Sequence, residues 1–268
     1  MHIHFLDPYR PLVSPIHSLD SRAKFVLTIA FILTVSLTPI AAWPVYILLF
    51  AVILSVEILS GLGVWFVLKR ASLALPFVLA ALPVLFTIHG QTLFTVPLGS
   101  RVFTASVEGL ERFVSIALKS WLSVQAAIVL SACTPFPELL QAMRAVGIPR
   151  LLVGMFGLMW RYLFVLVDEA LRMMTARAAR SGVEEGAVRK VGGSLAWRAR
   201  VTGGMAGSLF LRGFERSDRI YTAMLSRGYD GEVRSMLLPP FGSRNWFVLI
   251  YGLAFLGFLL LFGILFFG

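Results

Sequence analysis

Three long stretches of this chain contain no charged residue. They run from Phe25 to Val56, from Ala71 to Ser100 and from Asn245 to Gly268. A helix that crosses the hydrocarbon core of a membrane needs about 20 mostly apolar residues. Each stretch is long enough for at least one crossing, so the apolar pattern predicts an integral membrane protein.

The same pattern predicts five membrane spans. The first two are short and are joined by a turn that contains Pro39 and Pro44. A proline inside a helix costs about 3 kcal/mol, so two prolines this close mark a reversal of the chain. Between the third and fourth spans, residues 92–96 and 102–105 favour β-structure and predict a short external hairpin. The predicted spans are 25–39, 43–60, 72–89, 116–133 and 246–267.

The connection between the second and third spans is expected on the cytoplasmic side. It contains Lys69 and Arg70, and basic residues concentrate in cytoplasmic loops of membrane proteins. Glu57 lies near the same end of the second span. We expect it to pair with a cation or to extend towards the headgroups, because an isolated carboxylate inside a membrane is unfavourable.

A further apolar stretch, 151–167, is ambiguous. Its only charged residue is Arg161, and hydropathy alone would allow it to cross the membrane. Basic residues flank it on both sides, with Arg144 and Arg150 before it and 13 Lys and Arg residues in 172–244 after it. A crossing would place one of these flanks outside, against the positive-inside rule. We therefore predict that 151–167 lies against the other helices, with the N-terminus cytoplasmic and the C-terminus external.

Composition and charge agree with this picture. Hydrophobic residues make up 58% of the 268 residues and charged residues 14%, whereas soluble domains contain about 25% charged residues. The net charge of +10 would also suit binding to nucleic acid or anionic lipid. However, 16 of the 24 basic residues lie within 134–245, together with 9 of the 14 acidic ones, which leaves that segment at +7. Such a concentration favours one large cytoplasmic region.

The predicted fold class is therefore an all-α integral membrane protein with about five transmembrane helices and amphipathic cytoplasmic helices. In the second of these cytoplasmic helices an apolar stripe runs from Leu209 to Leu225 at helical spacing, and we expect it to pack on a core. Four regions follow. They are a cytoplasmic leader (1–24), a four-helix transmembrane region (25–133), a cytoplasmic helical region (134–244) and a final transmembrane helix (245–268).

Two cytoplasmic helices are expected to end in the same way. One ends in Ala179-Arg180-Ser181, followed by Gly182, and the other in Ser226-Arg227-Gly228. Glycine suits the left-handed position that terminates a helix, and arginine complements the negative end of the helix dipole. Either motif alone is an ordinary helix end. Because the motif occurs twice, it also suits a partner with two similar acidic pockets, in which arginine binds carboxylates through two parallel hydrogen bonds.

The leader adds a family resemblance. Residues 14–24, SPIHSLDSRAK, are similar to the S-P-L-H-x-L-D-P-R-x-K opening of the T component of energy-coupling factor (ECF) transporters. The two arginine motifs resemble the paired Ala-Arg-Gly motifs of that family, and the ending Tyr229-Asp230-Gly231 resembles its CbiQ type of cobalt transport protein. The resemblance covers nearly the whole chain. The sequence departs from the family at Ser21, Ser181 and Ser226, where proline, glycine and alanine are usual.

This resemblance implies a transmembrane coupling subunit of an ECF-type ABC importer in the bacterial cell membrane. Two helices crossed in an X would place their arginine ends in grooves of two ATPase subunits. ATP-driven closure of these subunits would then move a separate substrate-binding membrane subunit. Cobalt is the implied substrate, and nickel or a vitamin stays open. The implied coupling positions are Ala179, Arg180, Ser181, Ser226, Arg227 and Gly228.

Catalytic and metal motifs are missing from the sequence. It contains no G-x-x-x-x-G-K-[ST] loop, so ATP hydrolysis is expected in partner subunits and no cofactor is expected on this chain. An intramembrane lipid-modifying enzyme, the reading from another class, would need nucleophile or metal motifs that do not occur. The permease of an ordinary ABC importer couples through one helix, which leaves the second arginine motif unexplained. The histidines, His2, His4, His17 and His89, lack the spacing of a metal site, so we expect neither a metal site nor enzymatic activity.

Overall fold

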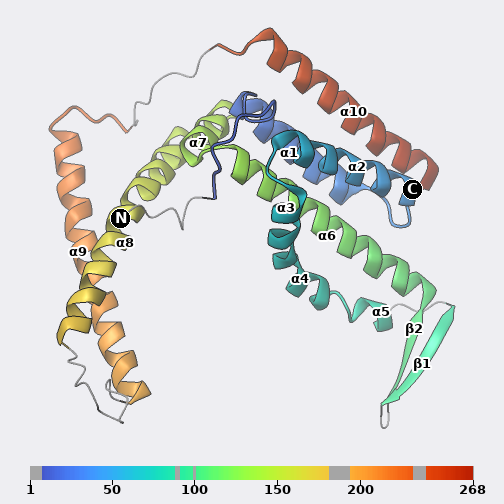
Figure 1. The fold of residues 1–268 in the computed structure, drawn as a ribbon, viewed down its shortest axis with the longest axis horizontal. Coiled ribbons are helices and arrows are strands. Elements are labelled where there is room, and N and C mark those ends of the chain that lie inside the picture. Colours follow the sequence, from blue (N-terminus) through green and yellow to red (C-terminus); the bar gives the residue numbers. More distant parts are fainter. Residues whose placement is uncertain (1–7, 88–90, 99–100, 181–193, 232–239, 268) are drawn as a thin grey trace. The chain divides into compact units, whose positions relative to one another are not determined.

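The computed structural model describes residues 8–87, 91–98, 101–180, 194–231 and 240–267. Within these ranges the chain is helical apart from one two-stranded hairpin, which confirms the predicted all-α membrane protein (Figure 1). The elements are α1 (Ser21–Leu37), α2 (Trp43–Ser60), α3 (Val64–Ala71), the 3₁₀ turn η1 (Ser72–Ala74), α4 (Leu75–Ala80), α5 (Val84–Thr87), β1 (Thr92–Leu98), β2 (Arg101–Ser106), α6 (Val107–Cys133), α7 (Phe136–Ala145), α8 (Arg150–Arg180), α9 (Leu195–Leu225) and α10 (Ser243–Phe267).

The chain divides into two compact units. We call residues 1–147 and 238–268 the membrane unit, and residues 148–237 the helix-pair unit. The helix-pair unit contains α8 and α9, and every other element belongs to the membrane unit. The short helix α7 packs on α1 and so belongs to the membrane unit, although its sequence follows the predicted cytoplasmic boundary at residue 134.

The core of the membrane unit lies between α1, α2, α6 and α10. Its fully buried side chains include Leu49 on α2, Leu122 on α6 and Leu259 on α10. On α10, a Cβ at Gly252 would come within 2.6 Å of Leu27 Cδ2, so this glycine allows α10 to approach α1 closely. The pattern of apolar residues at helical spacing thus produces one continuous core in this unit.

Contacts between side chains fix the directions of these helices. Lys24, at the start of α1, touches the end of α6 at Cys133. Lys119 of α6 in turn touches Ser36 near the end of α1. The two helices are therefore antiparallel. Gly252 and Gly263 of α10 lie near Leu27 and Thr38, respectively, so α10 runs parallel to α1.

The third predicted span was wrong in its boundaries. We expected one helix over 72–89, but the apolar segment begins at Val64 and is divided into α3, η1, α4 and α5. Pro76 and Pro83 explain the interruptions, because proline removes a backbone donor and clashes with the preceding turn. As a consequence, Lys69 and Arg70 lie in the last turn of α3 and not in a loop.

Among the described residues, five helical segments are long and apolar enough to cross a membrane. They are α2, the segment Val64–Thr87, α6, α8 and α10. The number equals the prediction, but the members differ. α1 has 17 residues and falls just short of this length, whereas α8 meets it. None of the apolar window of α8 is buried within the structure.

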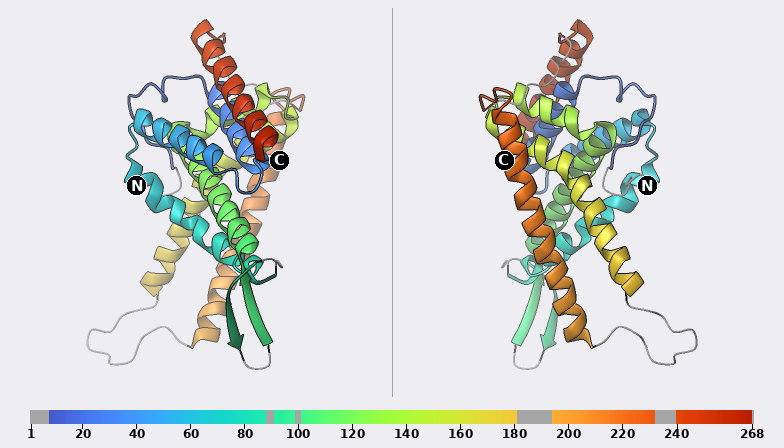
Figure 2. Two further views of the ribbon diagram at one scale, coloured as in Figure 1. Left: turned by 90° about the vertical axis from the view of Figure 1, so that its right-hand side faces the viewer. Right: turned by 90° about the vertical axis from the view of Figure 1, so that its left-hand side faces the viewer.

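The predicted hairpin is confirmed. β1 and β2 pair antiparallel, with Thr95 opposite Thr104, and Figure 2 shows the pair as a narrow ribbon beyond the start of α6. Glu57 neither pairs with a described cation nor extends towards the headgroups, as we had predicted it would. It is 1% exposed, and neither carboxyl oxygen has a hydrogen-bond partner among the described residues. The reason is its register, since Glu57 shares the buried face of α2 with Leu49, Ile53 and Ser60.

Candidate functional site

The C-terminal end of α9 has the geometry that its sequence predicted. Gly228 has a φ of 77°, which is the left-handed conformation. Its N–H donates to the carbonyl of Leu225 at 3.0 Å, and the N–H of Tyr229 donates to the carbonyl of Met224 at 3.0 Å. These two bonds form a Schellman motif, which satisfies carbonyls that the helix leaves free. Arg227 is therefore held at the cap of α9, and its side chain is exposed.

The end of α8 is described as far as Arg180. Ala179 and Arg180 are both exposed and helical, and Arg180 is the last residue of the helix. Ser181 and Gly182 lie outside the described residues. The first arginine motif is thus located by two of its three residues, and the second, Ser226-Arg227-Gly228, by all three.

The two helices pack antiparallel. The contacts pair residues early in one helix with residues late in the other, and the helices cross in the view of Figure 1. Three contacts set the register. Arg177 Nη1 donates to Thr202 Oγ1 at 3.2 Å, Ser208 Oγ lies 3.6 Å from Met173 Sδ, and Arg212 Nη1 lies 2.6 Å from Glu169 Oε1. All of them fall within 169–177 of α8 and 202–212 of α9.

This register places the two arginine ends far apart. In an antiparallel pair the C-terminal ends of the helices point in opposite directions. Arg180 lies opposite the part of α9 near Arg200, and Arg227 follows 27 residues later in sequence. With a rise of 1.5 Å per residue, the two arginines are separated by roughly 40 Å. The helix pair therefore presents two similar cationic ends at its two extremities.

A groove of about 610 Å³ lies between the helices beside Arg180. Its polar rim contains Arg172, Arg177 and Arg180, and its apolar wall includes Trp197. Among the described residues, Glu169 is the only acid that lines it, and that carboxylate is paired with Arg212. The groove is therefore strongly positive and suits an anionic partner.

We expected the apolar stripe of α9 to pack on a core, but it does not. One edge meets α8, where a Cβ at Gly213 would lie 3.5 Å from Leu166 Cδ2. The other edge is open, since Phe210 is 71% and Phe214 61% exposed. The stripe is wider than the contact that one antiparallel helix provides, so half of it stays uncovered. A Cβ added at Gly203, Gly204 or Gly207 of α9 would meet no described neighbour within 4 Å, so these glycines do not mark a close contact with another helix.

The leader binds several helix ends of the membrane unit together, a role that the sequence pattern did not disclose. The N–H of Arg10 donates to the carbonyl of Ala132 at 3.0 Å, and the guanidinium of Arg10 lies 3.7 Å from the ring centre of Phe66. Arg244 of α10 donates to the carbonyl of Ser18 at 3.0 Å. α3, α6 and α10 are thus connected through the leader.

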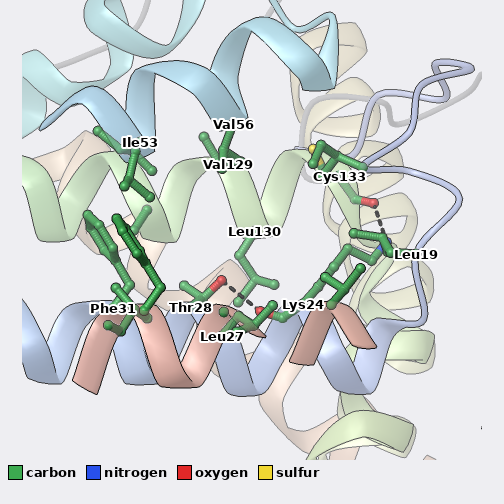
Figure 3. A pocket seen from close by; sticks show the side chains of 17 residues that line it. Leu19, Lys24, Leu27, Thr28, Phe31, Ile53, Val56, Val129, Leu130 and Cys133 are labelled. Carbon is green, nitrogen blue, oxygen red and sulfur yellow. Dashed lines mark hydrogen bonds between the residues drawn. The ribbon is translucent and has the colours of Figure 1, made fainter. Parts of the chain in front are cut away.

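Lys24 is the buried member of this arrangement. Its Nζ donates to the carbonyl of Cys133 at 3.1 Å, and the residue is 7% exposed. The ammonium group meets the last carbonyl of α6, where the helix dipole is negative. Figure 3 shows Lys24 at one end of an apolar cavity of about 250 Å³, with Phe31 and Ile53 towards the other. A cationic leader residue thus acts as a cap on another helix.

His17 is used within the leader. Its Nδ1 lies 2.7 Å from Ser14 Oγ, and its Nε2 lies 3.0 Å from the carbonyl oxygen of Arg10. A carbonyl only accepts, so Nε2 donates and Nδ1 accepts from the hydroxyl. Both ring nitrogens are occupied, which leaves none for a metal. In the described part of the chain, no group of three or more His, Cys, Asp or Glu residues could hold a metal ion. His2, His4 and His89 lie outside the described residues.

Comparison with known proteins gives consistent matches over most of the chain. The family model described as cobalt transport protein CbiQ matches residues 13–239. The energy-coupling factor transporter transmembrane protein EcfT of Thermosediminibacter oceani is 29% identical over 236 residues, which cover 84% of each chain. Cobalt transport protein CbiQ of Rhodobacter capsulatus is 26% identical over 193 residues, 72% of this chain and 74% of the relative. The putative fused cobalt transport protein CbiMQ of Methanocorpusculum labreanum is 24% identical over 246 residues, 88% of this chain and 38% of that protein.

Proposed function

The chain belongs to the CbiQ family of cobalt transport proteins, and from this premise we propose that it couples two ATPase subunits to a separate metal-binding membrane subunit. It is the transmembrane T component of an energy-coupling factor transporter, a multi-pass membrane protein. The names of its CbiQ relatives suggest cobalt as the transported ion. Nickel or a vitamin is the alternative substrate of the same role.

One observation supports the proposal of two ATPase subunits as partners. The two arginine motifs lie at opposite ends of one antiparallel helix pair, and Arg180 and Arg227 are both exposed. Two identical or similar ATPase subunits offer two similar sites separated by a distance of domain size. A helix pair about 40 Å long, with a cationic end at each extremity, reaches both sites at once. The permease of an ordinary importer, with a single coupling helix, would have no use for the second end.

Topology supports placing this pair on one side of the membrane. The leader contacts the end of α6 through Arg10 and the start of α10 through Arg244. The chain therefore leaves the membrane unit and returns to it at the same face. A segment with both ends at one face crosses the membrane an even number of times. If α8 crossed, α9 would have to return, and α9 contains seven charged residues.

We therefore place α8 outside the membrane core, on the cytoplasmic side, despite its apolar composition. The spans of this arrangement are α1, α2, the segment Val64–Thr87, α6 and α10. Because the basic helix-pair segment is cytoplasmic under the positive-inside rule, the N-terminus is cytoplasmic and the C-terminus external. The apolar faces of α8 and α9 are then available to the membrane surface or to a membrane subunit.

The chain has a mechanical role in this proposal and no catalytic one. It lacks a phosphate-binding loop, so ATP is bound and hydrolysed by the partner subunits. Recognition of the metal is assigned to the separate membrane subunit. This division agrees with His17, whose ring nitrogens are used within the leader.

The test is reversal of both arginine charges. Arg180→Glu combined with Arg227→Glu should reduce co-purification of the co-expressed ATPase subunits by at least about 100-fold, because each like-charge contact with an acidic pocket costs several kcal/mol. Arg219→Glu, an exposed residue of the same helix α9, is the matched control and should retain the complex. Size-exclusion profiles of the isolated variants verify folding. Wild-type recovery of ATPase subunits by the double variant would refute the proposed role of these two ends.

A further inference from the structure

Two basic residues of α6, Arg112 and Lys119, lie in the half of the helix remote from the leader. They are seven positions apart, which is two helical turns, so their side chains share one face. Each borders a hollow of about 440 Å³. Both hollows lie between α6, the end of α1 with its following turn, and the segment of η1, α4 and α5. We call these two hollows the outer groove. Its residues are Ser36, Ile40, Ala74, Phe77, Pro83, Val84, Thr87, Arg112, Ile116, Lys119, Ser120, Ser123 and Val124.

The cations of the outer groove have donors to spare. Lys119 Nζ donates to the carbonyl of Ser36 at 2.9 Å, and an ammonium group has three donors. Neither Lys119 nor Arg112 forms an ion pair within the described part of the chain. Glu108, one turn before Arg112, instead accepts a hydrogen bond from the N–H of Gln91 at 3.0 Å. Both cations can therefore bind an external anion.

Three serine hydroxyls of the groove are also available. Thr28 and Thr34 on α1 donate to the carbonyl one turn before them, as hydroxyls inside a helix usually do. Among the described residues, the hydroxyls of Ser36, Ser120 and Ser123 form no hydrogen bond. The polar lining of this part of the groove consists of hydrogen-bond donors beside one ammonium group, and this composition fits an oxyanion.

The depth of these residues in the membrane matches a headgroup. The contact of Lys24 with Cys133 marks the leader face of the unit. Arg112 precedes Cys133 by 21 residues of one continuous helix, or about 31 Å, and the hydrocarbon core is about 30 Å thick. Arg112 therefore lies at the headgroups of the opposite leaflet. Lys119 is about 10 Å deeper, and its Nζ lies at the carbonyl of Ser36.

The walls of the outer groove are apolar and indicate an occupant with apolar chains. Phe77 is 73% exposed, and Ile116 and Val84 line the hollow next to Arg112. We propose that the outer groove binds an anionic phospholipid of the leaflet opposite the leader. Arg112 and Lys119 hold its phosphate between them, and the acyl chains lie along Phe77 and Ile116. A protein partner would have to bring a carboxylate to this depth, which is costly, whereas a lipid phosphate is already there.

The proposal is independent of the coupling role, and the isolated full chain is sufficient to test it. Native mass spectrometry in an uncharged detergent would measure binding of dioleoyl phosphatidylglycerol and of dioleoyl phosphatidylcholine. We expect one phosphatidylglycerol to bind about tenfold more tightly than phosphatidylcholine, as charge-assisted hydrogen bonds predict. Arg112→Gln with Lys119→Gln should abolish this preference. Lys119→Arg, which keeps the charge, should retain it.

A charge-matched control is available on α3. Lys69→Gln with Arg70→Gln removes two exposed cations at the other end of the unit and should leave the lipid preference unchanged. An excess of inorganic phosphate should not displace the bound phosphatidylglycerol, because the acyl chains contribute apolar contacts. Equal binding of the two lipids by the wild type would overturn the proposal and leave the groove to a protein partner. Displacement by inorganic phosphate, or an unchanged preference in the Arg112 and Lys119 double variant, would also overturn it.

Discussion

The two units of this protein use some of their cationic residues in opposite ways. In the membrane unit, two cations of the leader point inward. Lys24 caps α6 at Cys133, and Arg10 lies over the ring of Phe66. In the helix-pair unit, Arg180 and Arg227 stand exposed at helix ends. Arginine and lysine at a helix terminus can thus either connect two helices of one chain or remain available for another molecule.

The two units also differ in how many of their side chains are buried. α2 and α6 bury several side chains each, whereas no residue of α8 or α9 is buried, although each of these helices has 31 residues. Most of the stability of a helix in a protein comes from tertiary packing of its apolar face. The membrane unit provides that packing for its own helices. The helix-pair unit leaves apolar side chains open, including Met155 and Met159, whose flexible side chains adapt to a partner surface.

The surfaces that are left open to other molecules are concentrated in the helix-pair unit. The open apolar faces and the exposed arginine ends occur on the same two helices, and these helices also carry the motifs that resemble the coupling motifs of the family. A unit that transmits motion between partners has to present surface to them, whereas the unit that anchors it in the membrane has to be stable alone.

The largest expected effect is an all-or-none difference in topology. A reporter inserted after Glu185, between the two helices, should be accessible only from the cytoplasm, and one fused after Gly268 only from outside. This follows from the even number of crossings that we propose between α6 and α10. Accessibility assays on intact and permeabilised cells would measure it. An external signal at Glu185 would place α8 across the membrane and remove the contrast between the two units.

A smaller effect is expected when the buried lysine is removed. Lys24→Met leaves the carbonyl of Cys133 without its partner in a buried position, which should destabilise the membrane unit by roughly 1–3 kcal/mol. Thermal unfolding of the purified chain in detergent would show a lower apparent Tm. Arg180→Met is the control in the helix-pair unit and should leave the Tm unchanged, because that side chain is exposed. Equal Tm values for Lys24→Met and wild type would mean that the inward cations do not stabilise the unit.

The smallest effect concerns the cap of α9. Gly228→Ala places a Cβ at a φ of 77° and should cost about 1 kcal/mol locally. Because Arg227 is held by this cap, recovery of ATPase subunits should fall about threefold to tenfold while the Tm of the membrane unit stays the same. Gly231→Ala, at a φ of 93° outside the Schellman motif, introduces similar strain without moving Arg227. Equal losses from both variants would show that backbone strain, and not the position of the arginine, reduces the recovery.

The class of protein and several local features follow from the amino-acid sequence alone. Membrane crossing depends on about 20 consecutive apolar residues, which is a local property, so the spans at 43–60 and 246–267 were predicted closely. The cap at Gly228 was predictable for the same reason, because its hydrogen bonds join residues at most five positions apart. The hairpin at 92–106 also follows from neighbouring residues.

How these elements work together depends on contacts between residues that are distant in the sequence. The bond from Lys24 to Cys133 joins residues 109 positions apart, and no local pattern announces it. The burial of Glu57 depends on which face of α2 meets its neighbours, and the open edge of the α9 stripe on how much of it α8 covers. The antiparallel register of α8 and α9, which sends Arg180 and Arg227 in opposite directions, arises from contacts such as Arg212 with Glu169. Such contacts are non-local, because they exist only once separate helices have packed against each other.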